Sequence, residues 1–320
     1  MNAALLLLSA PAPVAVFAYA RPDHLRATLD ALAANELAER TELVIFSDAP
    51  KDDAARDAVR QARAVARAAT GFAAVRVVER ERNYGLADSI VDGVTALTKS
   101  HGRVIVLEDD IVTAPCFLRY MNQALERYAD QDRVMHVAAH MFDIDPAGLP
   151  EAFFLGHSSC WGWATWKRAW DHFSRDADAF VRAFTPQDVH RFNLDGAYDY
   201  WGQLLANRDG RLKTWAVYWY ASVYSKGGLC LHPRASLVEN IGHDGSGANC
   251  LHAPDWANKA CGDAVSHLPD RLRVEDLALA RVQAHLRMLT GKAPVPCRKG
   301  LLNTLFTRMR RLVAPLLGGI

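Results

Sequence analysis

An α/β fold with a parallel sheet and helices on both faces is predicted by three features of the sequence. Short apolar runs that suit buried parallel strands recur along residues 1–130. Each run is followed by a segment with apolar residues at helical spacing. Polar side chains gather where the runs end, which is the edge of such a sheet at which ligands bind.

The expected elements alternate along the first half of the chain. Strands are expected over residues 14–19, 43–46, 75–78 and 104–107. Helices are expected from Pro22, where proline suits the first turn, and over residues 52–69, 86–98 and 115–128. Four consecutive strand–helix units imply a parallel sheet, because parallel strands need a crossover connection.

Composition excludes several classes of protein. The 320 residues include 37 Lys+Arg and 36 Asp+Glu, and a net charge of +1 argues against binding nucleic acid through its phosphates. The six cysteines form no CxxC pair, which favours buried free thiols over a zinc site. The apolar run at residues 3–8 is too short to span a bilayer, so we expect a cytoplasmic protein. The GxGxxG and GxxxxGK[ST] motifs are absent, which excludes a dinucleotide fingerprint and a P-loop.

Three carboxylates, Glu108, Asp109 and Asp110, directly follow the fourth apolar run. Like charges packed at a buried strand end are costly unless a cation lies among them. Mg2+ and Mn2+ suit carboxylates that leave other positions to water and substrate phosphates. The alternative is that these acids favour the start of the next helix, but Pro115, which opens it, is remote from Asp110. The sequence therefore predicts a Mn2+ or Mg2+ site.

The run VIVLEDDI at residues 104–111 resembles the DxD-type strand end of GT-A nucleotide-sugar glycosyltransferases. Its Glu-Asp-Asp form is similar to that of the N-acetylglucosaminyltransferase I group. The similarity extends to PVAVFAYARP at 13–22 and to Asp48, and the segment NYGLA at 83–87 resembles bacterial family 2 glycosyltransferases. The run CWGWATW at 160–166 resembles an acceptor-side loop, and AYDYW at 197–201 resembles the motif that holds the catalytic base.

This resemblance implies a GT-A (Rossmann-like) mixed sheet flanked by helices, with a C-terminal helical tail. It implies a nucleotide-sugar-binding half at residues 1–130 and an acceptor and catalytic half of the same domain at residues 131–270. Residues 271–320 would form C-terminal helices, one of them over residues 274–289.

The resemblance also implies roles for single residues. Asp110 would bind the metal directly, and His243 or His252 would complete the metal or diphosphate site. Arg21 and Asp48 would contact the nucleotide. The ribose and the donor sugar would be lined by Asn83, Gly85, Glu108 and Asp109. The implied donor-binding residues are Arg21, Asp48, Asn83, Gly85, Glu108 and Asp109.

The general base implied by the resemblance is Asp199, which would take the proton of the attacking sugar hydroxyl. A helix is expected over residues 194–207, and on it Asp195, one turn earlier, faces the same side and is the competing base.

All eight tryptophans lie in the second half of the chain. Most suit core packing, since large aromatic side chains dominate cores. Trp161 and Trp163 are the residues we expect to form a platform for the acceptor sugar. Gly162 between them would let the backbone approach that sugar.

Residues 298–320 carry one apolar face, one basic face and no acid. This pattern fits a helix on the inner face of a membrane, and equally a helix docked on the domain or on another subunit.

The predicted function is a metal-dependent inverting transfer of a hexosyl or N-acetylhexosaminyl group. The donor would be a nucleotide diphosphate sugar, with UDP the expected nucleotide, and the acceptor a glycan or a lipid-linked glycan of bacterial surface polysaccharide. One alternative is a sugar nucleotidyltransferase, but residues 18–22 lack the glycine-rich basic loop that such enzymes use. The other is an inactive carbohydrate-binding scaffold, which the intact acidic residues argue against.

Overall fold

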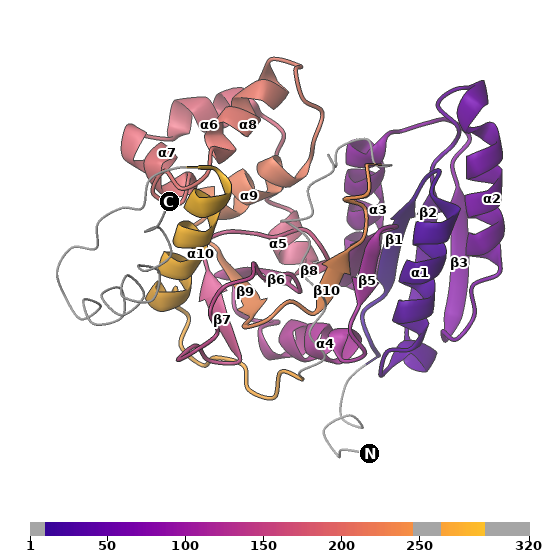
Figure 1. The fold of residues 1–320 in the computed structure, drawn as a ribbon, viewed down its shortest axis with the longest axis horizontal. Coiled ribbons are helices and arrows are strands. Elements are labelled where there is room, and N and C mark those ends of the chain that lie inside the picture. The colour runs from indigo at the N-terminus through magenta and orange to yellow at the C-terminus, as the bar shows by residue number, and fades with distance from the viewer. Residues whose placement is uncertain (1–9, 246–263, 292–320) are drawn as a thin grey trace, which may run out of the picture.

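The structure, a computed structural model, describes residues 10–245 and 264–291 (Figure 1). His252 and the amphipathic segment at residues 298–320 lie outside the described residues, so the predictions made for them stay predictions.

An eight-stranded mixed sheet organises the fold, with the strand order β3-β2-β1-β4-β8-β6-β9-β7. The neighbours β3, β2, β1 and β4 run parallel, whereas β8 runs antiparallel to both β4 and β6. The predicted α/β class with a mixed sheet flanked by helices is therefore confirmed. The strands of this sheet are β1 Val14–Ala18, β2 Glu42–Ser47, β3 Ala74–Glu79, β4 Arg103–Glu108, β6 Val134–Ala138, β7 Ala152–Leu155, β8 Trp163–Trp166 and β9 Leu229–Pro233.

Helices cover both faces of the sheet because alternate residues of each central strand point to opposite sides. Val14 and Val16 of β1 share a core with α1, α2 and α4, whereas Ala15 and Phe17 share a second core with α3, α5 and α9. In Figure 1, α6 to α9 gather on the side of the molecule away from α1 to α3. The helices are α1 Pro22–Ala33, α2 Arg56–Arg67, α3 Leu86–His101, α4 Phe117–Arg127, α5 Lys167–Trp170, α6 Ala177–Ala183, α7 Pro186–Phe192, α8 Tyr200–Arg208, α9 Ala216–Ser225 and α10 Asp276–Leu289, with short 3-10 turns at Ala38–Arg40 and Asp53–Ala55.

The carboxyl ends of the parallel strands meet at one edge of the sheet. Phe17 of β1 lies opposite Phe46 of β2 and opposite Glu108 of β4. The residues that follow these strands, among them Arg21 and Asp48, therefore share an edge with the acidic residues after β4, as the sequence predicts.

A separate two-stranded ribbon lies beside this edge. It pairs β5 Ile111–Thr113 with β10 Val238–Asn240 in antiparallel fashion, and Asn240 is opposite Ile111. Because β5 begins directly after Asp110, this pairing brings the residues after β10 back to the acidic strand end. The Ile241 amide donates to the Asp110 carbonyl at 2.9 Å.

The helix expected over residues 194–207 begins later than predicted, at Tyr200. Leu194 and Asp195 have φ angles of 49° and 53°, and Gly196 has a φ of 76°. A right-handed helix cannot run through three left-handed residues, so the expected start was wrong. Asp195 therefore lies in a turn before the helix and does not share a helix face with Asp199.

Within the described ranges, no helix combines the length and the hydropathy that crossing a bilayer requires.

Candidate functional site

The acidic strand end is built around one arginine. Asp109 and Asp110 are each only 4% exposed, and both accept hydrogen bonds from Arg21 Nη2, at 2.8 Å for Asp110 Oδ2. The Tyr19 amide donates to Asp109 Oδ2 at 3.2 Å, and the Thr28 hydroxyl donates to the Asp109 carbonyl at 2.9 Å. The loop after β1 and the first turns of α1 thus fix Asp109 and aim Arg21 at both carboxylates.

The charge at this strand end is not balanced by Arg21 alone. Three carboxylates meet one guanidinium here, so full ionisation would give the cluster a charge of −2, and the raised carboxyl pKa values oppose this. Burial, followed by repulsion from Asp110 and Asp109, raises the pKa of Glu108 to about 8. Burial also raises the pKa of Asp109, although Arg21 works against this. Such a site favours a divalent cation, which would relieve the repulsion.

Several buried polar atoms here lack a partner. Asp110 Oδ1, Arg21 Nη1 and both ring nitrogens of His243 are buried and make no hydrogen bond to any residue that the structure describes. Gly242 lies directly against the Asp110 carboxylate, so that a Cβ on the glycine would be 2.1 Å from Oδ2. His243 is the next residue along the chain. Carboxylate oxygen and imidazole nitrogen are both ligands that Mn2+ accepts, so these residues fit the predicted metal.

The protein offers few ligands of its own. In residues 10–245 and 264–291, no three His, Cys, Asp or Glu side chains are grouped closely enough to hold a metal ion. An ion bound by Asp110 would therefore take most of its ligands from water and from the phosphates of a substrate, which is the usual arrangement for Mg2+ at nucleotide sites.

Asp48 organises the loop that carries the other predicted donor residues. Its buried carboxylate accepts hydrogen bonds from three backbone amides: Tyr84 at 2.9 Å, Gly85 at 2.8 Å and Ala49 at 2.9 Å. The Asn83 side-chain amide donates to the Ala49 carbonyl at 2.7 Å. Asp48, Asn83 and Gly85 are thus brought together, and the predicted contact of Asp48 with a nucleotide base stays a prediction.

Of the three residues predicted to bind the acceptor, Trp161 is partly exposed, whereas Gly162 and Trp163 are buried. Trp161 is partly exposed, and its ring contacts the ring of His243 edge-to-face at 5.3 Å. Trp163 is only 1% exposed and stacks on Trp215 at 5.2 Å, so we correct its predicted acceptor contact to a core role. Its side chain points inward because β8 is buried along its whole length.

Gly162 also packs against side chains of the core. Its φ is +64°, and an added Cβ would lie 2.9 Å from Val238 Cγ1 and 3.3 Å from a ring carbon of Phe117. The glycine lets the backbone approach these side chains, which corrects its predicted approach to an acceptor.

The two candidate bases differ in their surroundings. Asp199 is exposed and caps α8, because its Oδ1 accepts the Gly202 amide at 2.9 Å. Asp195 Oδ2 accepts from Gln283 Nε2 at 2.8 Å, and the Asp195 carbonyl accepts from Arg287. Asp195 thus ties α10 to the turn before α8.

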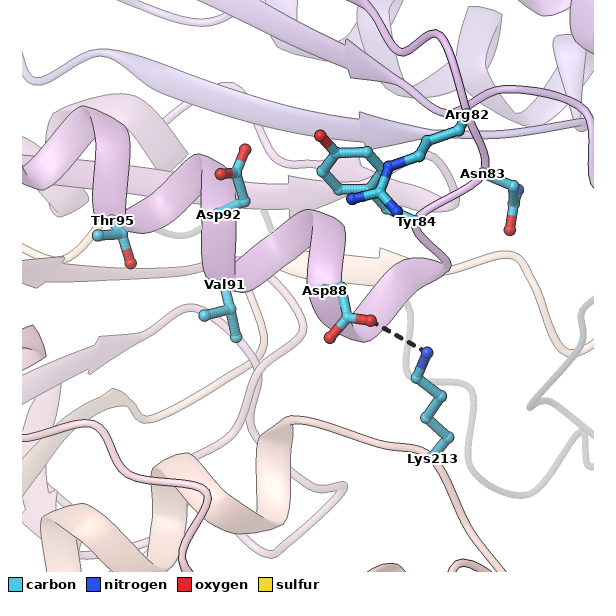
Figure 2. Close-up of a pocket in the computed structure, with 8 residues that line it drawn as sticks. All are labelled: Arg82, Asn83, Tyr84, Asp88, Val91, Asp92, Thr95 and Lys213. Carbon is cyan, nitrogen blue, oxygen red and sulfur yellow. Dashed lines mark ion pairs between the residues drawn. The ribbon is translucent and has the colours of Figure 1, made fainter.

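A cavity of about 650 Å3 lies along α3, and the loop residues Arg82, Asn83 and Tyr84 help to line it. Asp88 and Lys213 also line it and form an ion pair (Figure 2), with a distance of 3.0 Å. Asp88 also pairs with Arg175, and these two cations hold the pKa of its carboxyl below the usual value. The acidic strand end does not line this cavity, so we do not assign the chemistry to it.

Sequence reasoning missed the contact between Gly242 and Asp110. The glycine-rich stretch around it was visible, but its partner lies far away in the chain. Only the pairing of β5 with β10 brings the two together.

Comparison with known proteins gives one family. The family described as "Glycosyltransferase like family 2" matches residues 10–177. No protein of curated function matches the sequence.

Among solved structures, a mannosyltransferase from Pyrobaculum calidifontis in complex with GDP-Man and Mn2+ is 13% identical, with a TM-score of 0.37. The match covers 68% of this chain and 70% of that one. Glucosyl-3-phosphoglycerate synthase from Mycobacterium tuberculosis, in complex with Mn2+, UDP-glucose and phosphoglyceric acid, is 14% identical, with a TM-score of 0.32. That match covers 50% of this chain and 57% of the synthase.

Proposed function

This chain belongs to the glycosyltransferase-like family 2, and from that premise we propose a metal-dependent, inverting transfer of a sugar from a nucleotide diphosphate to a glycan or lipid-linked acceptor. UDP is the nucleotide we propose. The observation that carries the proposal is the buried Asp110 carboxylate at the end of β4: one of its oxygens makes no hydrogen bond to a described residue, and Gly242, the chain neighbour of His243, packs against it.

The donor would bind across the strand ends. A divalent ion held by Asp110 and His243 would neutralise charge on the departing diphosphate. Arg21 supports this role because its Nη1 is buried and makes no hydrogen bond to a described residue, which leaves a donor for a phosphate oxygen. Asp48 would hold the Asn83–Gly85 loop against the ribose through the backbone amides that its carboxylate accepts.

Asp199 would act as the base. As the acceptor oxygen attacks the anomeric carbon, its proton passes to Asp199, and the bond from that carbon to the diphosphate oxygen breaks. One displacement of this kind inverts the configuration and needs one base. Asp199 suits the role because it is exposed, and its Oδ2 is not used by the cap hydrogen bond that Oδ1 makes with Gly202.

Asp195 is the weaker candidate for the base. Its carboxylate is engaged by Gln283, and its backbone carbonyl is engaged by Arg287. These contacts support a structural role in holding α10.

Incubation with UDP-sugars and GDP-sugars in the presence of Mn2+ tests the activity through release of the nucleotide diphosphate. The proposal predicts release that EDTA abolishes. A sugar nucleotidyltransferase would instead release pyrophosphate from a nucleoside triphosphate and a sugar phosphate. A carbohydrate-binding scaffold would bind glycans and turn over neither pair.

We also propose that the protein works on a hexosyl or N-acetylhexosaminyl donor in bacterial surface polysaccharide synthesis, at the inner face of the membrane. The support is the basic, acid-free segment at residues 298–320. Deleting this segment should abolish sedimentation with anionic vesicles and keep nucleotide release. Vesicle binding that survives the deletion would contradict the membrane proposal.

A further inference from the structure

Six aromatic and imidazole rings form a continuous row in the second half of the chain. They come from five segments that meet beside the mixed sheet: those that follow β6, β7 and β10, the segment that precedes β8, and the start of α8. The centroid distances along the row are 5.3 Å for His243–Trp161, 4.6 Å for Trp161–His140, 5.2 Å for His140–Phe142, 6.1 Å for Phe142–His157 and 5.1 Å for His157–Tyr200.

One end of this ring row lies next to the residues proposed to bind the diphosphate, and the other end lies next to the proposed base. His243 follows Gly242, which packs on Asp110, and Tyr200 follows Asp199, the proposed base. The row therefore joins the residues proposed for the diphosphate to the residue proposed for the attacking hydroxyl.

Exposed rings and buried imidazoles alternate along the row. Trp161, Phe142 and Tyr200 are partly exposed, whereas His140 and His157, which lie between them, are 3% and 4% exposed. Partly exposed aromatic rings offer apolar faces and edges to a ligand, and the imidazoles between them carry polar nitrogen atoms.

Each of the two buried imidazoles keeps one nitrogen without a partner. His140 Nδ1 is hydrogen-bonded to Ser159 Oγ at 2.9 Å, and His157 Nε2 is hydrogen-bonded to the Tyr200 hydroxyl at 2.7 Å. His140 Nε2 and His157 Nδ1 are buried and make no hydrogen bond within the part of the chain that the structure describes. Unpaired buried polar groups are rare in native proteins, and a ligand or an ordered water normally accounts for them.

Both imidazoles are uncharged near neutral pH. Burial, together with nearby histidines, lowers the pKa of His140 to about 3 and lowers that of His157 well below its usual value. His140, His157 and the aromatic rings beside them are therefore uncharged, and apolar ring faces suit sugar rings better than they suit a phosphate or a carboxylate.

We propose that the ring row is the acceptor subsite and that it binds an uncharged sugar unit against the partly exposed rings of Phe142 and Trp161. This assignment rests on the proposed glycosyl transfer for its place in a reaction. The binding of a neutral sugar to the row does not depend on that transfer.

Saturation-transfer NMR on the full chain tests the subsite without turnover. The probes are the methyl glycosides of glucose, galactose, mannose and N-acetylglucosamine, with glycerol 3-phosphate as an anionic comparison. Phe142→Ala removes one ring of the row, Phe142→Tyr restores a ring, and Phe184→Ala makes the same truncation at a partly exposed phenylalanine that stacks on Trp201 elsewhere.

The proposal predicts saturation transfer to at least one glycoside and none to glycerol 3-phosphate. Phe142→Ala should weaken glycoside binding about tenfold, while Phe142→Tyr and Phe184→Ala should bind as the wild type does. The proposal is overturned if no glycoside receives saturation, if glycerol 3-phosphate is preferred, or if Phe142→Ala binds like the wild type. The last result would assign the unpaired nitrogens to ordered water.

Titrating UDP and Mn2+ into the same samples separates the two proposals. A wild type that binds glycosides through Phe142 but binds no nucleotide would keep the sugar subsite and refute the transferase. If the wild type binds nucleotide and Phe142→Ala binds glycosides as tightly as the wild type does, the subsite alone is refuted.

Discussion

Gly242 packs directly on the carboxylate of Asp110. A Cβ added to the glycine would lie 2.1 Å from Asp110 Oδ2 and 2.9 Å from Arg21 Nη1. Asn240 Oδ1 holds the glycine in place by accepting its amide at 2.8 Å. The absence of a side chain at position 242 therefore sets the position of the carboxylate and of the arginine beside it.

Replacing Gly242 with Ala should displace Asp110 and Arg21 together. Overpacking of this kind typically costs roughly 1–3 kcal/mol, which here would weaken Mn2+-dependent nucleotide binding by about tenfold or more. Calorimetric titration with UDP and Mn2+ measures the loss. Gly156→Ala is the matched control, because an added Cβ at Gly156 meets nothing within 4 Å. Equal affinities for the two variants would contradict the packing argument.

Asp199→Asn should reduce kcat by roughly 100- to 10,000-fold, because an amide cannot take the proton of the attacking hydroxyl. Asparagine caps helices as well as aspartate does, so α8 and the folded state should persist. Donor binding should be nearly unchanged. Steady-state kinetics, with circular dichroism to verify the fold, provides the measurement.

Asp195→Asn is the matched comparison. Asparagine tolerates the left-handed conformation at this position, whose φ is 53°, so the turn should survive. We expect kcat to change far less than in Asp199→Asn. If the two variants rank in the opposite order, Asp195 is the base, and if neither matters, a single-base inverting mechanism is wrong.

Stability should fall in acid because His136 is buried and neutral. Trp219 Nε1 donates to its Nδ1 at 3.0 Å, and its Nε2 is hydrogen-bonded to the Ser159 carbonyl at 2.9 Å, so a second proton would face the indole N–H. Burial, followed by repulsion from His232, lowers the pKa of His136 to about 3.

The direction of the effect follows from where the protons bind. Between about pH 6.5 and the folded pKa, the unfolded chain binds a proton that the native state does not. The free energy of unfolding is therefore undiminished above about pH 6.5 and falls as the pH is lowered through this window. His136 alone should make it about 1.4 kcal/mol smaller at about pH 5.5 than at about pH 7.5. Urea unfolding at the two pH values measures this difference, and equal stabilities would show that His136 is not held neutral.

The first half of the fold could be predicted because its central strands β1, β2 and β4 are buried on both faces. Runs such as residues 104–107 are then continuously apolar, and the acids after them stand out. The expected helix start at residue 194 was wrong because Leu194, Asp195 and Gly196 are left-handed, and Asp195-Gly196 is a turn signal in the sequence. Trp161 and Trp163 could not be told apart from sequence, since only the strand pairing shows which side chain points into the core.

The remaining parts of the site depend on contacts between distant segments. Gly242 reaches Asp110 through the pairing of β10 with β5, and His140 meets Trp161 because β6 and β8 are neighbours in the sheet. No local motif marks such contacts, because each segment shows only its own periodicity.

The most direct test of the account is a calorimetric titration of UDP into the wild type and into Asp110→Asn, each with Mn2+ and with EDTA. Asparagine keeps the shape of the side chain, and Arg21 keeps its hydrogen bond to Asp109, so the fold should hold. The account predicts that UDP binds the wild type with Mn2+, that EDTA abolishes this binding, and that Asp110→Asn does not regain it with Mn2+. UDP affinity that is the same in all four titrations, or the same in the two proteins with Mn2+, would contradict a metal-bound donor at the end of β4.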